Sequence, residues 1–334
     1  MNKKDLQPTL ESPFLVECIR EYYHVQAIEL HRLPSDSGKY IFRVDLADGT
    51  RQILRVVTDP DKSAFFELAR LLQFFEQQGY PAERIILTIG QTATASVEGW
   101  QLLMTTFLVG APLEYTPSAF RLLGGAVGRL HALKPALTYN PPRAGMLPSN
   151  ELAFAQRQLD AVAALVPPVY IPQFDLLEEA LSSLDRGTHL PTTLIHNDCH
   201  PFNAVMMAPG HVSLLDWEGS GLGPAVLDVA FLLSNCDGKA PWFPLEADDP
   251  FHPNTRLLHA VIEGYCQYYQ LTTAELDYLV DAIRFRSLVF GACSFAAAIA
   301  QQQNAGFSQW WWTRYRAVDE IADQARTRFE QLFR

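Results

Sequence analysis

The stretch from residue 194 to residue 218 constrains the fold of this chain more than any other segment. It carries two apolar runs, residues 204–207 and 212–215, and Pro209-Gly210 lies between them. Pro followed by Gly suits a type II turn, so we expect the two runs to pair as an antiparallel hairpin. A longer loop with the same centre is the alternative.

Polar residues flank the open end of this expected hairpin. A symmetric hairpin about Pro209-Gly210 places Asn203 opposite Asp216, with Cβ atoms about 5 Å apart. An amide oxygen and a carboxylate at that separation can share one hard cation, and Mg²⁺ takes oxygen ligands. Asp198 lies in the loop that leads to the same end, so a further carboxylate stands beside the cation pair. A base for a hydroxyl next to metal ligands for ATP is what phosphoryl transfer requires.

Two other interpretations of these residues remain open. His196, Cys199 and His200 could form a metal cluster, although a zinc site needs about four ligands in separated pairs and the sequence has no second pair of suitable spacing. Asn203 and Asp216 could simply cap the hairpin, which would leave Asp198 without a role.

The wider pattern over residues 195–233 reads IHNDCHPFNAV, then LLDWE, then GPAVLDVAFLL. It resembles the aminoglycoside phosphotransferase/choline kinase family of small-molecule kinases, whose catalytic loop shares the spacing H-x-D-x-x-x-x-N. The chain departs from the usual family pattern at Asn197, where Gly is common, and at Phe202. Neither position carries the chemistry.

The resemblance gives the polar residues of this stretch their expected roles. It implies that Asp198 is the catalytic base and that His196 supports the loop. It implies that Asn203 and Asp216 are the magnesium ligands. From a following helix, Asp228 would brace the catalytic loop. Glu218 would bind either a second metal or a cation of the substrate.

In the N-terminal third of the chain, residues 27–33 and 40–46 alternate as strands do, and further strands are expected over residues 52–57, 84–89 and 100–107. A helix is expected over residues 62–78, with Gly79 as its C-terminal stop. In the family, the loop between the first two strands covers the ATP phosphates, and here that loop offers Ser35, Ser37 and Gly38. A plain hairpin turn is the alternative for this loop.

Arg55 lies in the middle of the third expected strand, where central strands seldom carry a charge without a partner. The resemblance places it where kinases keep the lysine that holds the α- and β-phosphates, and arginine can bind phosphate bidentately. Glu67, in the following helix, is its expected partner. Backbone groups near Met104, Thr105 and Phe107 would bind the adenine edge. The alternative for Arg55 is a side chain that reaches solvent from an edge strand.

From Thr116-Pro117 onward the chain is mostly helical, and Thr272 with Glu275 forms a capping box for a later helix. A single last helix is expected over residues 308–333. The resemblance implies an α+β, protein-kinase-like two-lobe fold. Residues 1–108 would form a nucleotide-binding sheet lobe, and residues 109–334 a helical lobe with the catalytic loop and the substrate pocket.

Charge and cysteine content narrow the class of partner. The formal net charge is −11, which argues against nucleic acid as a partner and allows a cationic substrate. The acidic stretch over residues 234–253, which includes Asp237, favours the same substrate class. The five cysteines lie in apolar contexts and indicate reduced thiols in the cytoplasm. The start shows no signal peptide, and the apolar run 288–300 is too short to span a membrane.

Together these observations predict an ATP- and Mg²⁺-dependent phosphotransferase, a monomer or homodimer, that acts on a hydroxyl of a small molecule. The acceptor is expected to bear an amine, as in an amino alcohol, a homoserine-like amino acid or an aminoglycoside. The alternatives are a protein Ser/Thr kinase of the same fold and a non-catalytic nucleotide-binding scaffold. A scaffold would be expected to lack the base or a metal ligand, and all three are present here.

Overall fold

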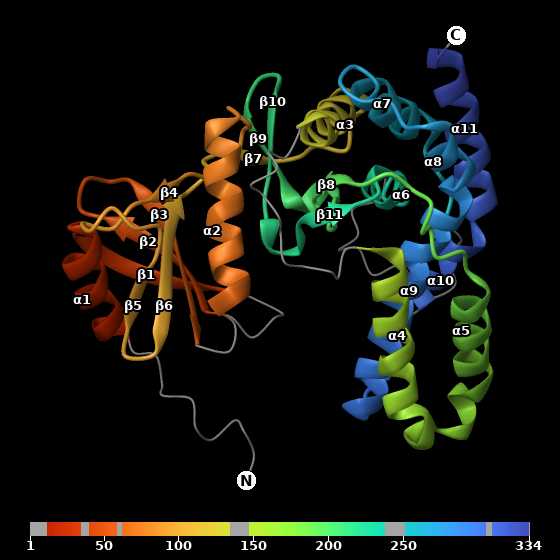
Figure 1. Ribbon diagram of the computed structural model, residues 1–334, viewed down its shortest axis with the longest axis horizontal. Coiled ribbons are helices and arrows are strands. Elements are labelled where there is room, and N and C mark those ends of the chain that lie inside the picture. The colour runs from red at the N-terminus through yellow and green to blue at the C-terminus, as the bar shows by residue number, and fades with distance from the viewer. Residues whose placement is uncertain are drawn as a thin grey trace. The chain divides into compact units, whose positions relative to one another are not determined.

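The computed structural model describes residues 12–34, 40–58, 62–133, 147–237, 251–304 and 309–333 (Figure 1). The chain divides into two compact units, Met1–Val109 and Gly110–Arg334. The first unit is built on an antiparallel sheet and the second is mainly helical.

The sheet of the first unit has six strands in the order β1-β2-β3-β6-β4, and β5 also pairs with β6. The strands are β1 (Ala27–Leu33), β2 (Tyr40–Leu46), β3 (Arg51–Thr58), β4 (Ile85–Ile86), β5 (Ala95–Val97) and β6 (Trp100–Thr106). The four long strands lie where the sequence predicts them. The strand expected over residues 84–89 is shorter, because Thr88 turns the chain by bonding to Thr92 through both backbone and hydroxyl. The short strand β5 was not predicted.

Two helices flank this sheet, α1 (Ser12–Tyr23) and α2 (Lys62–Gln77). Residues Leu54 and Val56 of β3 share a buried apolar cluster with α1. Successive side chains of a strand point to opposite faces, so Arg55 points to the other face of the sheet. α2 buries Phe65, Leu68, Leu72 and Phe75, the helical face that the sequence predicts, and ends just before Gly79, whose φ is 65°.

The second unit contains nine α-helices within the described residues. They are α3 (Pro117–Ala132), α4 (Pro148–Val162), α5 (Ile171–Ser183), α6 (Ala225–Leu233), α7 (Thr255–Tyr265), α8 (Thr273–Asp277), α9 (Leu279–Ala300), α10 (Gln309–Arg316) and α11 (Val318–Phe333). The predicted caps are present: Thr116 accepts a hydrogen bond from Ala119 N–H, and Thr272 and Glu275 cap each other. The prediction of a single last helix was wrong, because the helical segment is interrupted between α10 and α11.

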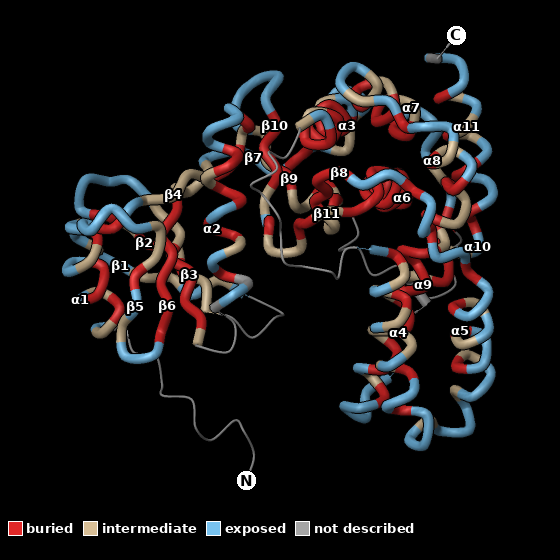
Figure 2. The backbone as a smooth tube through the Cα atoms, in the orientation of Figure 1, coloured by how far each residue is buried: buried red, intermediate tan, exposed pale blue. Residues whose placement is uncertain are grey.

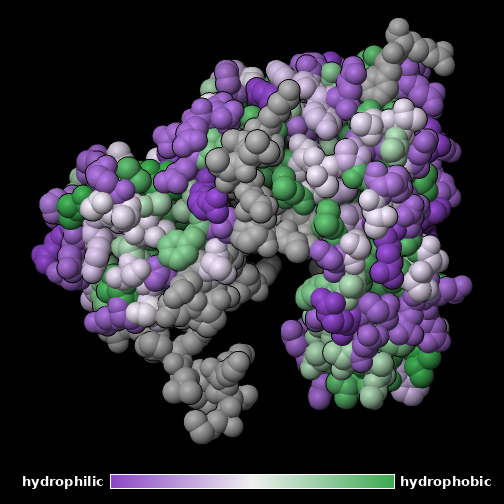
Figure 3. All heavy atoms as spheres, in the orientation of Figure 1, coloured by the Kyte–Doolittle hydropathy of each residue, from purple (hydrophilic) through white to green (hydrophobic). Residues whose placement is uncertain are grey.

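Burial within this unit centres on α6, all of whose residues are buried (Figure 2). α9 is the one described helix long and apolar enough to cross a membrane, and 67% of its apolar window is buried inside the protein, as in the core helix of a globular unit. Exposed apolar side chains gather where α4 and α5 are joined by the short 3₁₀ helices η4 (Ala163–Leu165) and η5 (Pro168–Tyr170) (Figure 3).

α3 and α7 approach each other backbone to backbone. A Cβ atom on Gly264 of α7 would lie 1.8 Å from the carbonyl oxygen of Arg121, and one on Gly124 of α3 would lie 2.1 Å from that of Val261. Glycine is therefore required at these crossings. His131 lies in α3 and Tyr265 lies in α7, and their side chains contact each other.

Two small sheets complete the second unit. One contains β10 (His211–Leu214), β9 (Ala204–Ala208) and β7 (Ala111–Pro112) in that order, and the other pairs β8 (Thr193–Ile195) with β11 (Gly221–Gly223). The loop with His196, Asn197 and Asp198 follows β8 directly, and the 3₁₀ helix η6 (Pro201–Asn203) leads from it into β9.

Candidate active site

The β9–β10 hairpin forms around Pro209-Gly210, but its register differs from the symmetric one by one residue. His211 pairs with Ala208, whereas Leu214 pairs with Ala204 after a shift between His211 and Val212. Asn203 consequently faces Leu215, whose N–H donates to the Asn203 carbonyl at 2.8 Å. The prediction that Asn203 and Asp216 form a cross-strand pair was therefore wrong. A bulge near the turn takes up the extra residue, and such bulges leave no mark in an apolar run.

Asp216 nevertheless lies at the same end of the hairpin, one residue beyond the Leu215 pairing. Its backbone is left-handed, with φ of 59°, and it begins the 3₁₀ helix η7 (Trp217–Gly219), which carries Glu218. Carboxylate and amide oxygens are suitable ligands for Mg²⁺. The Nδ2 group of Asn203 donates to the Asp198 carboxylate, so the Oδ1 atom of Asn203 faces away from Asp198. The donor set of Asn203 and Asp216 thus suits this ion.

Asn203 fixes the carboxylate of Asp198. Its Nδ2 group donates to Asp198 Oδ2 at 2.7 Å and to the Asp198 carbonyl at 3.0 Å. His200 Nε2 lies 3.6 Å from the other carboxylate oxygen. Burial acts to raise the pKa of Asp198, but the hydrogen bond and charge of His200, with help from His196 and Asn203, outweigh it and lower that pKa. Asp198 is therefore an ionised acceptor at neutral pH.

His196 is fully buried and supports the same loop. Its Nε2–H donates to the Leu215 carbonyl at 2.7 Å, and its Nδ1 accepts from the N–H of Asp198 at 3.3 Å. These two contacts require the neutral ring with the proton on Nε2. Burial lowers the pKa of His196 below its ordinary value despite the nearby charge of Asp228, which keeps the ring neutral. His196 thus ties the loop to the end of the hairpin.

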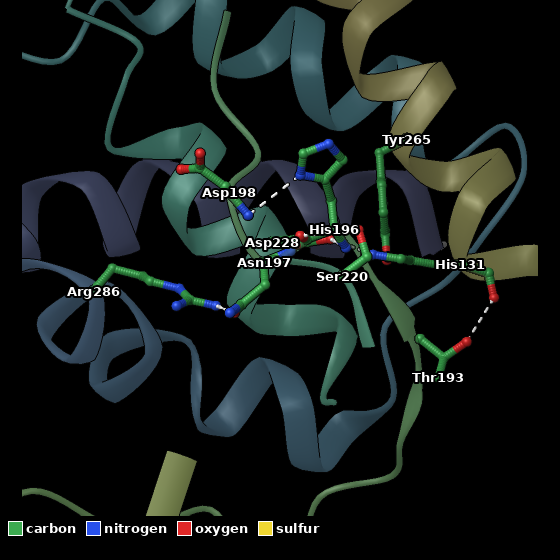
Figure 4. A network of polar contacts seen from close by, with 9 residues as sticks. All are labelled: His131, Thr193, His196, Asn197, Asp198, Ser220, Asp228, Tyr265 and Arg286. Atoms are coloured by element: carbon green, nitrogen blue, oxygen red, sulfur yellow. Dashed lines mark hydrogen bonds and ion pairs between the residues drawn. The ribbon is translucent and has the colours of Figure 1, made fainter. Parts of the chain in front are cut away.

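Asp228 of α6 holds the loop from beneath (Figure 4). Its Oδ2 accepts from the N–H of His196 at 2.6 Å, and its Oδ1 accepts from the N–H of Asn197 at 2.8 Å. Its Oδ2 also lies 3.1 Å from Nε2 of His131. Burial acts to raise the pKa of Asp228, but the hydrogen bond and charge of His131 together with His196 lower it. A buried carboxylate therefore satisfies two consecutive loop amides.

His131 of α3 belongs to the same buried network. Besides its contact with Asp228, its Nδ1 lies 2.8 Å from the Tyr265 hydroxyl of α7. Its carbonyl accepts from the hydroxyl of Thr193 in β8 at 3.0 Å. A histidine in an apolar helical run needs a polar partner when buried, and that requirement was the available signal in the sequence.

Arg55 of the first unit is paired with Glu83 and not with the predicted Glu67. Its two terminal nitrogens lie 2.9 and 2.8 Å from the two carboxylate oxygens of Glu83, and Nη1 also donates to the hydroxyl of Thr105 at 3.0 Å. Glu67 instead pairs with Arg70 at 3.1 Å. Glu83 reaches this position because β4 pairs with β6, with Ile85 opposite Thr105. The sequence did not reveal Glu83, because a two-residue strand carries no periodic signal.

The other predicted nucleotide-binding residues that the structure describes lie in β6 and just after it. Met104 and Thr105 are buried in β6 and pair with β3 on one side and β4 on the other. The chain leaves the sheet at Phe107, whose N–H donates to the Arg51 carbonyl at 3.4 Å. The predicted phosphate-loop residues lie outside the described residues; they are Ser35, Ser37 and Gly38.

Asp237, a candidate for the substrate cation, is engaged by an arginine. Its carboxylate lies 3.1 Å from Nη2 of Arg314, whose Nε donates to the Ser234 carbonyl at 3.0 Å. Burial lowers the pKa of Arg314 to about 10 although Asp237 acts against it. Glu246, Asp248 and Asp249, the rest of the predicted acidic stretch, lie outside the described residues.

Comparison with known proteins identifies the family and the fold of the chain. The family model of the phosphotransferase enzyme family (APH) matches residues 29–277. No curated protein matches the chain. Among solved structures, the amicoumacin kinase hAmiN, in complex with AMP-PNP, Ca²⁺ and Ami, is 17% identical with a TM-score of 0.68, and 96% of each chain is covered.

Two further solved structures show the same fold. The spectinomycin phosphotransferase APH(9)-Ia, in complex with ADP and spectinomycin, is 12% identical with a TM-score of 0.65, covering 96% of this chain and 100% of that one. The microcompartment-associated aminopropanol kinase is 14% identical with a TM-score of 0.59, covering 94% and 99%. With a protein-kinase-like fold and a family match over most of its length, the chain belongs to the phosphotransferase enzyme family.

Proposed function

We propose that this phosphotransferase moves the γ-phosphate of ATP to a hydroxyl of a small molecule, with Asp198 as the residue that orients the hydroxyl and accepts its proton. The observation that carries the proposal is the ionised Asp198 carboxylate, which Asn203 fixes at 2.7 Å. Its lowered pKa suits a group that acts mainly by orientation, because in phosphoryl transfer positioning and charge stabilisation supply most of the catalysis.

Asn203 and Asp216 are the proposed ligands for Mg²⁺, which would supply positive charge to the phosphate oxygens of the nucleotide. Arg55 is the proposed contact of the non-transferred phosphates. Its pairing with Glu83 fixes the guanidinium plane, in the way a carboxylate holds the corresponding lysine of kinases. His196 and Asp228 keep the loop in place and touch neither substrate.

We further propose that the acceptor bears an amine and that the enzyme works in the cytoplasm. The net charge of −11 draws cations, and Glu218 lies two residues after Asp216. Asp237 does not support this proposal, because Arg314 already compensates its charge. The similar fold of an aminopropanol kinase and a spectinomycin phosphotransferase points to the same class of acceptor. Buried free thiols such as Cys199 and Cys236 suit a reducing compartment.

A first experiment tests the base. Asp198→Ala should abolish ATP turnover while calorimetry still detects Mg·ATP binding, because Asp198 serves the hydroxyl and not the nucleotide. Asp216→Ala should instead abolish Mg·ATP binding, since a direct metal ligand has no substitute. Asp175→Asn, an exposed carboxylate on α5, is the matched control and should behave as the unaltered protein. Loss of ATP affinity in Asp198→Ala would contradict the assigned role.

A second experiment tests the acceptor. ADP release is coupled to an optical signal across amino alcohols, hydroxy amino acids, aminoglycosides and neutral sugars, each at low and high salt. Turnover of an amine-bearing acceptor whose KM rises with salt is expected, because screening weakens the attraction between opposite charges. Turnover confined to neutral sugars, with KM unchanged by salt, would exclude the amine. ATP binding without turnover of any compound would favour a protein kinase or a scaffold.

A further inference from the structure

A buried arginine contacts the catalytic loop from a helix that has no other part in the site. Arg286 lies in the middle of α9, and its side chain is 1% exposed. Its Nη1 lies 3.1 Å from the carboxylate of Glu151, in the first turn of α4. Its Nη2 donates to the side-chain oxygen of Asn197 (Figure 4). Burying a charged group is costly, so such an arginine needs partners that hold it in one position.

Asn197 is the residue directly before Asp198, and its backbone is left-handed with φ of 69°. Glycine adopts this conformation without strain, whereas asparagine adopts it at some cost. The side chain of asparagine carries an amide group, which glycine lacks. Its backbone N–H is held by Asp228 and its side chain by Arg286, so this residue is fixed at both ends.

We propose that Arg286, itself held by Glu151, is a positioning residue for the phosphoryl transfer. It fixes the side chain of Asn197 and thereby the direction in which Asp198 leaves the loop. This inference rests on the proposed role of Asp198. It assigns a role to the position at which this chain departs from the common glycine of its family, and it links α4 and α9 to the base.

The rival explanation is that Arg286 only joins α4 to α9. Asn197→Gly separates the two, because glycine accepts φ of 69° and the fold survives while the contact with Arg286 is lost. Arg286→Met removes the guanidinium group and keeps an unbranched side chain that fills the stem of the arginine. Because it leaves the buried Glu151 carboxylate without its charged partner, the double variant Glu151→Gln/Arg286→Met is measured beside it. Arg284→Met is the matched control. Arg284 lies on the same helix, its side chain is 35% exposed, and among the described residues its ion-pair partners are Asp281 and Asp319.

The first readout is ATP hydrolysis without an acceptor, together with calorimetric Mg·ATP binding. We expect kcat to fall about tenfold or more in Asn197→Gly and in Arg286→Met with KM for ATP unchanged, because misplacing a reacting group by about 1 Å can cost up to 100-fold. When Arg286→Met is added to Asn197→Gly, kcat should fall less than about twofold further, because both act through one contact. Independent effects that multiply, or a lowered melting temperature at unchanged kcat, would overturn the inference.

The second readout does not depend on phosphoryl transfer. Hydrogen exchange over residues 196–203 should become faster in Arg286→Met and in Asn197→Gly, and stay unchanged in Arg284→Met. Unchanged exchange in the first two variants would overturn the inference. If the unaltered protein binds no ATP but shows this exchange pattern, the proposed function fails while the positioning of the loop by Arg286 stands.

Discussion

Replacing Asp228 by asparagine tests the support of the catalytic loop most directly. The carboxylate is fully buried and accepts from the N–H groups of His196 and Asn197 at 2.6 and 2.8 Å, with His131 Nε2 at 3.1 Å. Asparagine keeps one acceptor oxygen but turns an NH₂ group toward the remaining donors. Two charge-assisted hydrogen bonds are lost, each worth about 1.5–3 kcal/mol. Because the loop relaxes in part, we expect the free energy of unfolding to fall by about 3–5 kcal/mol.

Urea unfolding at pH 7 measures this loss, with equal m-values showing that the compared states are the same. Asp175→Asn is the control, because Asp175 is exposed on α5, and its unfolding free energy should change by less than about 0.5 kcal/mol. ATP turnover in Asp228→Asn should fall even at temperatures where the variant is folded. A loss below about 1 kcal/mol would refute the reasoning, since it would mean that the loop amides find other acceptors at little cost.

Glu83→Gln should weaken Mg·ATP binding, measured by calorimetry, because Arg55 loses the charged partner that fixes its plane; unchanged affinity would show that this pairing serves stability alone. Gly264→Ala should cost at least about 2 kcal/mol in urea unfolding, because its Cβ would lie 1.8 Å from the Arg121 carbonyl; a smaller loss would show that α3 and α7 separate easily. Burial lowers the pKa of His196 from 6.5, so the unfolded chain binds more protons below pH 6.5 and stability should fall there; replacing His196 by Gln should flatten this dependence, and an unaltered slope between pH 7.5 and 5 would contradict it.

The fold was predictable where a helix or strand is long enough to show its pattern in the local sequence. The four long strands span seven or eight residues each and the α2 helix spans 16, which is long enough for strand-like composition or helical spacing to show in the local sequence. The register of the β9–β10 hairpin was not predictable, because one bulged residue near Pro209-Gly210 shifts it without altering the apolar pattern. The break between α10 and α11 was missed for a similar reason, since the apolar pattern continues across it.

In the candidate site, contacts between residues close in sequence were predictable, whereas contacts between residues far apart in sequence were not. Asp198 and Asn203 lie five residues apart in one loop, so their mutual contact follows from spacing. Glu83 and Arg286 each meet their partners across at least 22 positions of the chain, at distances that only the packed fold sets. Each also has another charged residue close by in the chain, Arg84 after Glu83 and Arg284 before Arg286, so the sequence alone cannot distinguish either from a surface side chain. Their burial supplies that distinction.

The positions of the buried polar groups follow from the needs of the loop itself. A loop that must present Asp198 in one direction cannot use the hydrogen bonds of a helix or a sheet, so its backbone amides are left without partners. Asp228 accepts the amides of His196 and Asn197, and Arg286 holds the side chain of Asn197, the residue directly before Asp198. Rigidity of the base therefore depends on charges buried in α6 and α9. Substitutions in those helices should reduce stability and catalysis together, whereas substitutions of Asp198 should reduce catalysis alone.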